Sequence, residues 1–222
     1  MTSSEILKQL KRYSNKKNIE GMARFGIQGK KMIGGPAIPV LRRMAKDIKK
    51  TESDTHGIAQ DLWSSGYHEA RILASMIDDP KLVTSVQMED WVKDFDSWDV
   101  CDQVCMNLFD KTKFTIDKIN KWSKCKEEFV KRASFALMAA LAFHSKDMSD
   151  NVFIGFLPII KREATDESNY VRKAVNWALR QIGKRNNNLK KEALKTANDI
   201  LILNNKTARW IAMDAKRELL SK

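Results

Sequence analysis

The sequence is short of cysteine, proline and glycine. Its 222 residues include three cysteines, four prolines and nine glycines. An odd and sparse set of cysteines predicts reduced thiols, as in cytoplasmic proteins, and excludes a disulfide framework. The shortage of proline and glycine argues against an all-β protein, which needs many tight turns. What remains is a chain with few breaks in its regular structure.

Long apolar runs and a leader sequence are lacking as well. The longest apolar run, Phe135–Phe143, is too short to span a bilayer. The first residues, Met1–Glu5, contain no basic segment followed by an apolar stretch, so we expect no signal peptide. These observations predict a cytoplasmic protein without a membrane partner.

No metal or cofactor is expected either. The cysteines Cys101 and Cys105 are four residues apart, on one face of a helix, but no nearby pair of ligands completes a metal site. Packing in the core is the simpler interpretation of both. The sequence has three scattered histidines, none at a useful spacing from a carboxylate or a cysteine: His56, His68 and His144.

Positive charge is in excess. The chain has 40 Lys and Arg against 28 Asp and Glu, a net charge of +12. An excess of this size favours a polyanionic partner, because each cation that neutralises a phosphate releases condensed counterions. Charge alone leaves three alternatives open, namely nucleic acid, an anionic membrane surface and no specific partner.

Apolar residues recur three and four positions apart in many segments, which is the period of a helix. No stretch alternates with a period of two, so the whole chain is predicted to be all-α. The clearest helical segments are Ser4–Tyr13, Ile38–Lys50, Tyr67–Ile77, Phe129–Phe143 and Tyr170–Gly183.

A weak internal repeat joins a basic residue to an apolar helix that carries small residues. The basic positions are 61, 41 and 36 residues apart: Arg71, Arg132, Lys173 and Arg209. The widest gap has room for one more unit, around Trp98–Phe109. Such periods are typical of stacked helical hairpins, so we predict an α-α superhelix, a curved solenoid with a basic concave face, in one domain over residues 1–222. A solvated basic face without function is the alternative.

The densest polar cluster runs from Asp96 to Asp102. On a helix, Trp98 and Asp102 are i and i+4, so the ring and the carboxylate share one face. Ser97 or Asp96 is expected to cap the helix, and Asp99 to favour its first turn. Capping does not account for Asp102, which lies beyond the first turn.

A second tryptophan, Trp177, lies in the middle of a predicted helix with Arg172, Lys173 and Arg180 nearby. A tryptophan in such a place usually packs in the core. Its electron-rich face can also attract a cationic base or sugar, so both interpretations stay open.

These segments resemble the AlkD-like DNA alkylation repair proteins, HEAT-repeat glycosylases that excise positively charged alkylpurines. The resemblance covers nearly the whole chain. Trp98–Asp102 is similar to the W-D-x-x-D segment of the family, which holds the catalytic aspartate and a stacking tryptophan. Val130–Ala133 is similar to the segment with a backbone-contacting arginine, and Tyr170–Arg180 to the helix with the second tryptophan. One departure is Glu20–Ile27, which shows no clear match to an N-terminal tyrosine of the family and puts the substrate range in doubt.

The resemblance implies a role for each of these residues. Asp102 would be the catalytic carboxylate, Trp98 and Trp177 the aromatic walls, and Arg132 a phosphate contact. It also implies that the damaged base is handled without being flipped into a deep pocket. Further contacts with DNA are expected from the remaining basic positions of the repeat and its neighbour: Arg71, Arg172, Lys173 and Arg209.

The function implied is that of a monofunctional alkylpurine DNA glycosylase in base excision repair. It would hydrolyse the N-glycosidic bond of cationic purines, of the 3-methyladenine and 7-methylguanine type, in duplex DNA. We expect a monomer without an obligate protein partner, associated with the nucleoid when bound to DNA. Two alternatives remain: a non-catalytic HEAT-repeat binder of damaged or branched DNA, and a helical-repeat scaffold that binds proteins.

Overall fold

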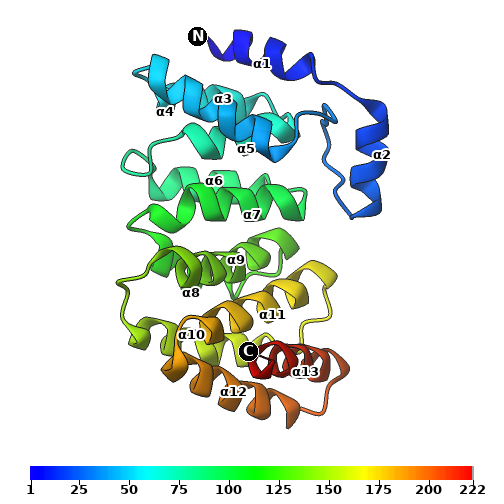
Figure 1. Ribbon diagram of the computed structural model, residues 1–222, viewed down its shortest axis with the longest axis vertical. Coiled ribbons are helices and arrows are strands. Elements are labelled where there is room, and N and C mark those ends of the chain that lie inside the picture. Colours follow the sequence, from blue (N-terminus) through cyan, green and yellow to red (C-terminus); the bar gives the residue numbers. More distant parts are fainter. Residues whose placement is uncertain (222) are drawn as a thin grey trace. The chain divides into compact units, whose positions relative to one another are not determined.

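The computed structural model describes residues 1–221. These residues form 13 α-helices and one short 3-10 helix, with no strand among them, which confirms the all-α prediction (Figure 1). The chain divides into two compact units, Met1–Lys113 and Phe114–Lys222. None of the helices in the described part of the chain is long and apolar enough to cross a membrane. The prediction of one domain over residues 1–222 stays a prediction.

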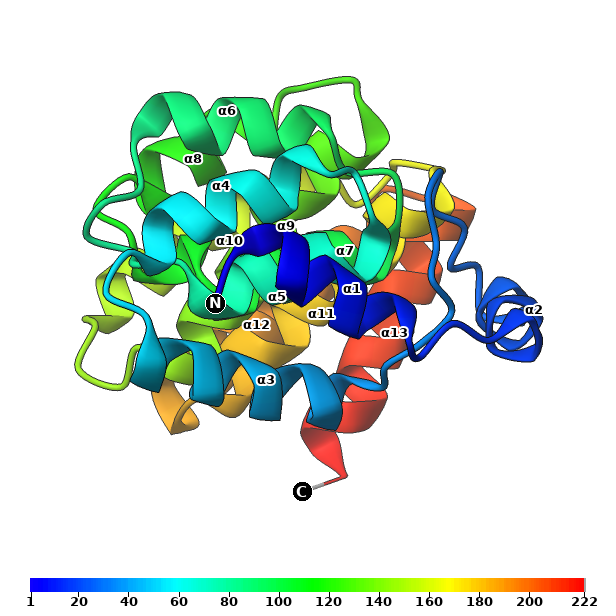
Figure 2. The same cartoon turned by 90° about the horizontal axis from the view of Figure 1, so that it is seen from above.

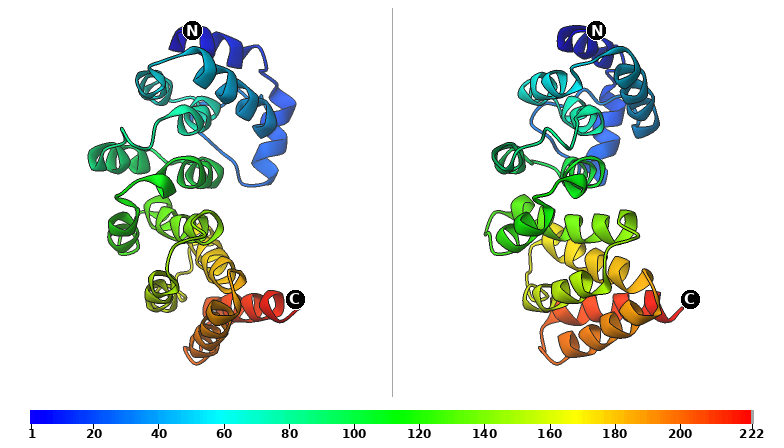
Figure 3. Two further views of the ribbon diagram at one scale, coloured as in Figure 1. Left: turned by 60° about the vertical axis from the view of Figure 1, so that its left-hand side comes forward. Right: turned by 90° about the vertical axis from the view of Figure 1, so that its left-hand side faces the viewer.

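The first unit places its helices in two layers, with α2 to one side (Figures 2 and 3). One layer contains α4 and α6, and the other contains α5 and α7; α5 packs against α3, α4 and α7. The helices of this unit are α1 (Ser3–Lys11), α2 (Lys16–Arg24), α3 (Ile38–Thr51), α4 (Thr55–Ser64), α5 (His68–Ile77), α6 (Ser85–Lys93) and α7 (Trp98–Asn107), followed by the 3-10 helix η1 (Phe109–Lys111).

The second unit repeats the two-layer pattern. Helices α9, α11 and α13 pack one on the next, and α10 packs on α12 in the other layer, where α8 covers α9 (Figure 3). This is the arrangement that stacked helical hairpins produce, since each pair buries its apolar face against its neighbour. The helices of this unit are α8 (Thr115–Trp122), α9 (Glu128–His144), α10 (Asp150–Arg162), α11 (Asn169–Lys184), α12 (Asn187–Leu201) and α13 (Lys206–Leu220).

Polar side chains determine where several helices begin. Thr2 and Glu5 form a capping box at α1, in which each side chain bonds the backbone N–H of the other residue. The Asn205 side chain accepts the backbone N–H groups of Thr207 and Ala208 at the start of α13. Such caps satisfy donors that have no partner inside the helix.

The observed starts of the helices change which basic residues occupy equivalent positions in the repeat. The fourth residue of α5, α9, α11 and α13 is always basic, and these residues are Arg71, Lys131, Arg172 and Arg209. Two of the four positions predicted from the sequence, Arg132 and Lys173, are therefore fifth residues of their helices. One step along a helix turns the side chain by about 100°, so these two need not share a face with Arg71 and Arg209.

An aromatic stack ties α4 to α6 in the first unit. The rings of Trp63 and Trp91 are parallel, with centroids 3.9 Å apart. The guanidinium of Arg71 lies 5.1 Å from the Trp63 ring, and it donates to the backbone carbonyl of Asp94 at 2.9 Å. The indole N–H of Trp63 donates to the Asp94 carboxylate at 2.9 Å. Arg71 thus holds three helices together, and its predicted contact with DNA stays a prediction.

Replacing Trp63 by alanine is expected to destabilise the first unit. The side chain is almost fully buried, and its loss removes the stack and the contact with Arg71 together. A buried tryptophan replaced by alanine costs about 3–5 kcal/mol of unfolding free energy. Urea unfolding measures this cost. The control is Trp210→Ala, at a ring that is 41% exposed, with an expected loss of about 1 kcal/mol or less. Equal losses in the two variants would contradict the role of the stack.

Candidate active site and nucleic-acid interface

The candidate catalytic residues of the first unit lie at the start of α7. Trp98 is the first residue of the helix and Asp102 the fifth, one turn further along, and both are half-buried. The indole Nε1 of Trp98 donates a hydrogen bond to the backbone carbonyl of Phe25, at 3.1 Å. This bond holds the tryptophan against the end of α2.

Phe25 is an aromatic residue that the sequence analysis did not single out. It is the C-cap of α2, its side chain is 76% exposed, and it lies in the stretch Glu20–Ile27, where no clear aromatic match was expected. An exposed phenylalanine next to a tryptophan provides a surface on which a base can stack. The signal in the sequence was present, since Phe25 is the one aromatic residue of that stretch.

A buried histidine supports the first turn of α7. Nε2 of His68, on α5, lies 2.9 Å from Oδ2 of Asp99. The other carboxylate oxygen of Asp99 accepts the hydroxyl of Ser97, the N-cap residue. The prediction that no histidine meets a carboxylate is therefore wrong, because α5 packs on α7 and closes a separation of 31 residues. Asp99 lies in the first turn as expected, but it also joins two helices.

His68 and Asp99 shift each other's pKa in opposite directions. Burial alone would lower the pKa of His68, but the hydrogen bond to Asp99 and the negative charges nearby raise the pKa above its ordinary value. Burial alone would raise the pKa of Asp99, but the hydrogen bonds from His68 and Ser97 lower it. Both shifts favour an imidazolium–carboxylate pair.

Two further carboxylates hold the loop between α2 and α3. The buried Glu69 accepts the backbone N–H groups of Ile33 and Gly34, at 3.0 and 2.7 Å. Gly34 has a φ of 72°, a conformation that favours glycine. Asp96, one of the two predicted caps, accepts the backbone N–H of Lys30 at 2.9 Å, and Ser97 occupies the N-cap position. These bonds fasten the loop to α5 and to the start of α7.

In the second unit, three predicted DNA contacts lie near the starts of α11 and α13. Lys173 and Arg209 are exposed, and Arg172 is half-buried. The guanidinium of Arg172 lies 5.6 Å from the ring of Trp210 and donates to the Asn169 side chain. These cations and the exposed indole form a mixed basic and aromatic surface, which is typical of nucleic-acid binding.

Trp177 is half-buried on α11, so one part of its ring is open to contact. Arg180, one turn further along the same helix, forms ion pairs with Glu218 and Asp214 of α13. Because these carboxylates already neutralise it, Arg180 is a poor candidate for a phosphate contact.

Arg132 is the one predicted DNA contact that is buried, with 5% of its surface exposed. Its guanidinium donates to the backbone carbonyl of Tyr170 at 2.6 Å, which joins α9 to the start of α11. The neighbouring Lys131 forms ion pairs with Glu163 and Asp166, at 3.0 and 2.8 Å. The phosphate contact of Arg132 stays a prediction.

The candidate residues come from both units: Trp98 and Asp102 from the first, Arg132 and Trp177 from the second. Their assembly into one site stays a prediction. Residues 1–221 contain no group of three or more His, Cys, Asp or Glu side chains placed to hold a metal ion. Cys101 and Cys105 are fully buried, and burial raises the pKa of the Cys105 thiol.

The sequence model of one protein family, described as "DNA alkylation repair enzyme", matches residues 6–219 of the chain. The chain belongs to this family. A search of curated proteins gave no match.

Among solved structures, the chain is similar to one described as "a new family of proteins related to the HEAT-like repeat DNA glycosylases with affinity for branched DNA structures". The TM-score is 0.76 at 18% identity, and the match covers 89% of this chain and 83% of the other. At this identity the likeness shows the fold, and it confirms the HEAT-like helical repeats of this DNA alkylation repair family member.

Asp99→Asn is expected to lower the unfolding free energy in a pH-dependent way. The raised pKa of His68 gives stability below about pH 6.5 that is lost as the pH rises through the folded pKa, and the lowered pKa of Asp99 gives stability above about pH 3.9 that is lost as the pH falls. The loss should therefore be largest between these values, about 1–3 kcal/mol for a hydrogen bond between charged groups. Urea unfolding across this range measures it. A loss that does not change with pH would contradict the ion pair.

Lys173→Gln is expected to weaken binding to all DNA duplexes by a similar factor. Lys173 is exposed, and a phosphate contact releases counterions, so the slope of log affinity against log salt should fall by about one. Fluorescence anisotropy at several salt concentrations measures the slope. The control is Lys191→Gln on α12, the same charge change in the other helix layer, which should leave the slope nearly unchanged. A loss that depends on the DNA sequence would contradict a phosphate contact.

Proposed function

We propose that this DNA alkylation repair family member is a monofunctional glycosylase that removes cationic alkylated purines from duplex DNA. The observation that carries the proposal is the pair Trp98 and Asp102, one turn apart at the start of α7. A carboxylate facing DNA would weaken binding to phosphates, so a pure DNA binder has no need of it. A carboxylate beside an aromatic ring suits a site where positive charge appears during a reaction.

The chemistry begins with the lesion itself. Alkylation at N3 or N7 places a positive charge on the purine, so the base leaves without being protonated. As the C1′–N bond breaks, its electron pair neutralises the departing base, and the sugar becomes an oxocarbenium ion. Asp102 stabilises this cation and orients a water molecule. The water oxygen then bonds to C1′, and the proton it loses passes to solvent, which leaves an abasic site.

The other residues position the DNA and the lesion. The face of Trp98 attracts the same cation, in addition to the carboxylate. Lys173, Arg172 and Arg209 bind phosphates and set the register of the duplex without reading its sequence. Hydrogen bonds from the network of His68 and Asp99 keep α7 in place.

Binding of branched DNA without catalysis is the second candidate. The structural neighbour at TM-score 0.76 belongs to proteins described as having affinity for branched DNA. In this chain, the exposed Trp210 beside Arg172 and Arg209 would suit the unstacked bases and crowded phosphates of a junction. On this alternative the chain would bind a four-way junction more tightly than a duplex and would release no base.

Asp102→Asn is expected to slow the release of 7-methylguanine from duplex DNA by about 100-fold or more. The change keeps the shape of the side chain and removes the charge that opposes the oxocarbenium ion. Affinity for the duplex should hold or rise, because a negative group near phosphates has gone. Single-turnover assays for released base and abasic sites measure the rate.

The matched control is Asp90→Asn on α6, the same change at an exposed aspartate that pairs only weakly with Lys93. Its rate should equal that of the unaltered protein. Full activity in Asp102→Asn would remove Asp102 from the mechanism. Excision of uracil, a neutral base, by either form would also contradict the proposal, because the site contains no acid assigned to protonate a leaving base.

A further inference from the structure

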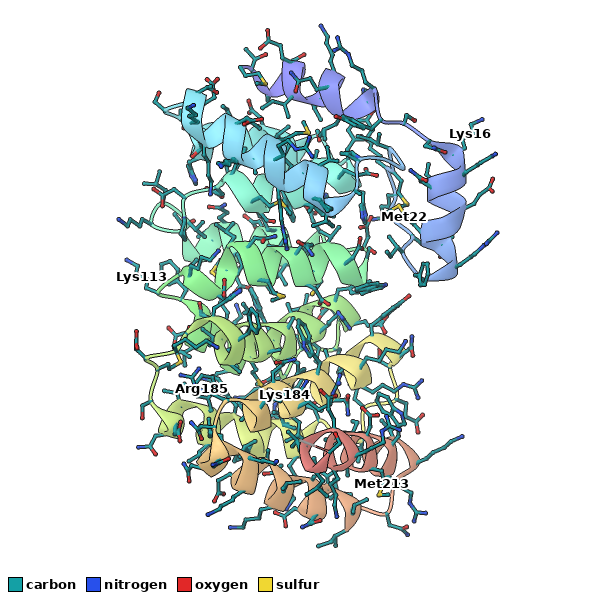
Figure 4. The ribbon with its side chains drawn as sticks, in the orientation of Figure 1. Lys16, Met22, Lys113, Lys184, Arg185 and Met213 are labelled. Carbon is teal, nitrogen blue, oxygen red and sulfur yellow. The ribbon has the colours of Figure 1, made fainter. Side chains whose placement is uncertain are left out.

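One side of α13, in the second unit, is exposed and carries both basic and apolar side chains. The helix packs against α11 and α12, which bury its other sides. The exposed residues recur every three or four positions along one stripe, with Arg209 beside it: Lys206, Trp210, Met213, Arg217 and Leu220. Met213 is labelled on α13 in Figure 4. The exposed fractions of Trp210, Met213 and Leu220 are 41%, 56% and 63%. Apolar side chains that gather on a surface among charges mark an interaction site, and we call this stripe, with Arg209, the α13 face.

The cations around Trp210 are not neutralised by carboxylates. Lys206, Arg209 and Arg172 form no ion pair with any residue in the range 1–221. The acidic residues of α13, Asp214 and Glu218, pair with other cations of α11 and α13, which are Arg180, Lys184 and Arg217. The start of the α13 face therefore has an uncompensated positive charge, which suits an anionic partner.

Trp210 is held in one orientation although it is exposed. The guanidinium of Arg172 lies over its ring, 5.6 Å from the centroid, and donates to the Asn169 side chain at 3.1 Å. A cation over one face of an indole leaves the other face open and restrains the ring. A preformed aromatic surface loses little conformational entropy when a flat ligand stacks on it. The partner is thus expected to be anionic and to offer a flat apolar face.

We propose that the α13 face binds an unpaired DNA strand. A base of the strand stacks on Trp210, and its phosphates contact Lys206 and Arg209, a combination that tolerates any sequence. In a duplex, neighbouring bases cover both faces of each base, so only an unpaired base can use the ring fully. Helix α13 has 15 residues and is about 22 Å long, which gives room for several nucleotides.

Two other partners fit the α13 face less well. An anionic membrane favours an unbroken apolar surface, whereas Arg217 lies between Met213 and Leu220. A second copy of the chain would bring two identical faces together, and these contain cations and no carboxylate. Membership of the DNA alkylation repair family also favours a nucleic acid.

The inference goes beyond the proposed function, because it requires neither a lesion nor a reaction. It also differs from binding of branched DNA, since one unpaired strand is sufficient and no branch point is needed. Its consequence is a protein that is retained on duplexes next to a gap or a single-stranded tail.

Binding of DNA without a lesion tests the proposal on the whole protein. The probe is a fluorescein-labelled oligothymidylate of about ten nucleotides, within the range of single-strand sites. Trp210→Ala should weaken its affinity by about tenfold or more, the effect of losing one stacked base. Trp210→Phe keeps an aromatic ring and should restore most of the affinity. Fluorescence anisotropy measures all three proteins.

The matched control is Phe143→Ala on α9. Its ring is 55% exposed, and Nζ of Lys146 lies 5.4 Å from the centroid, so this change also removes an exposed aromatic residue beside a cation. This variant should bind the oligothymidylate like the unaltered protein. An equal loss in Phe143→Ala and Trp210→Ala, or no loss in Trp210→Ala, would overturn the proposal.

A duplex with a single-stranded tail supplies the second arm. The tail should raise the affinity above that of the blunt duplex, and Trp210→Ala should remove this gain. Binding to phosphatidylglycerol vesicles, or dimerisation, that is lost in Trp210→Ala while oligothymidylate binding is kept would overturn the proposal in favour of the other partners. None of these DNAs contains an alkylated base, so failure here leaves the glycosylase function standing, and absence of excision leaves strand binding standing.

Discussion

A contact between the buried His68 and the half-buried Asp99 holds the turn of helix on which the rest of the candidate site depends. The contact joins α5 to the first turn of α7, and Ser97 completes it from the N-cap. Trp98 and Asp102 take their directions from this turn. Because His68 is buried, loss of its carboxylate partner would leave an unpaired charge in the interior, and the turn is correspondingly fixed.

Several carboxylates lie near this contact, although the protein is strongly basic. The chain has a net charge of +12, yet the start of α7 and the adjoining face of α5 contain Asp96, Asp99, Asp102 and Glu69. Basic residues of α11 and α13 suit the phosphate backbone of DNA, whereas carboxylates suit a cationic base or sugar. This division of charge fits a protein that must bind a polyanion and act on a cation within it.

The sequence predicted the helices well, and for a physical reason. Apolar residues at helical spacing must be buried on one side, and HEAT-like pairs bury them against each other, so periodicity alone identified α5, α9 and α11. Positions on the helix surface were harder to predict. Arg132 and Lys131 are neighbours in the sequence, which does not show which of the two is buried. In the structure α9 begins at Glu128, and the buried residue is Arg132, whose guanidinium donates to the backbone carbonyl of Tyr170.

The parts of the site that sequence reasoning missed are tertiary contacts. No spacing along the chain connects His68 with Asp99, since their contact exists only because α5 packs on α7. Phe25 was visible as an aromatic residue, but its place beside Trp98 depends on the path of the loop after α2, which Glu69 holds through backbone N–H groups. Hydrogen bonds to backbone leave no pattern in the side-chain sequence.

The central claim is that this family member breaks the glycosidic bond of a cationic purine. The most direct measurement incubates the unaltered protein in excess with two duplexes, one containing a single 7-methylguanine and the other a single uracil. The account predicts stoichiometric release of 7-methylguanine with formation of an abasic site, and no release of uracil. Tight binding to the methylated duplex without release of the base would contradict it.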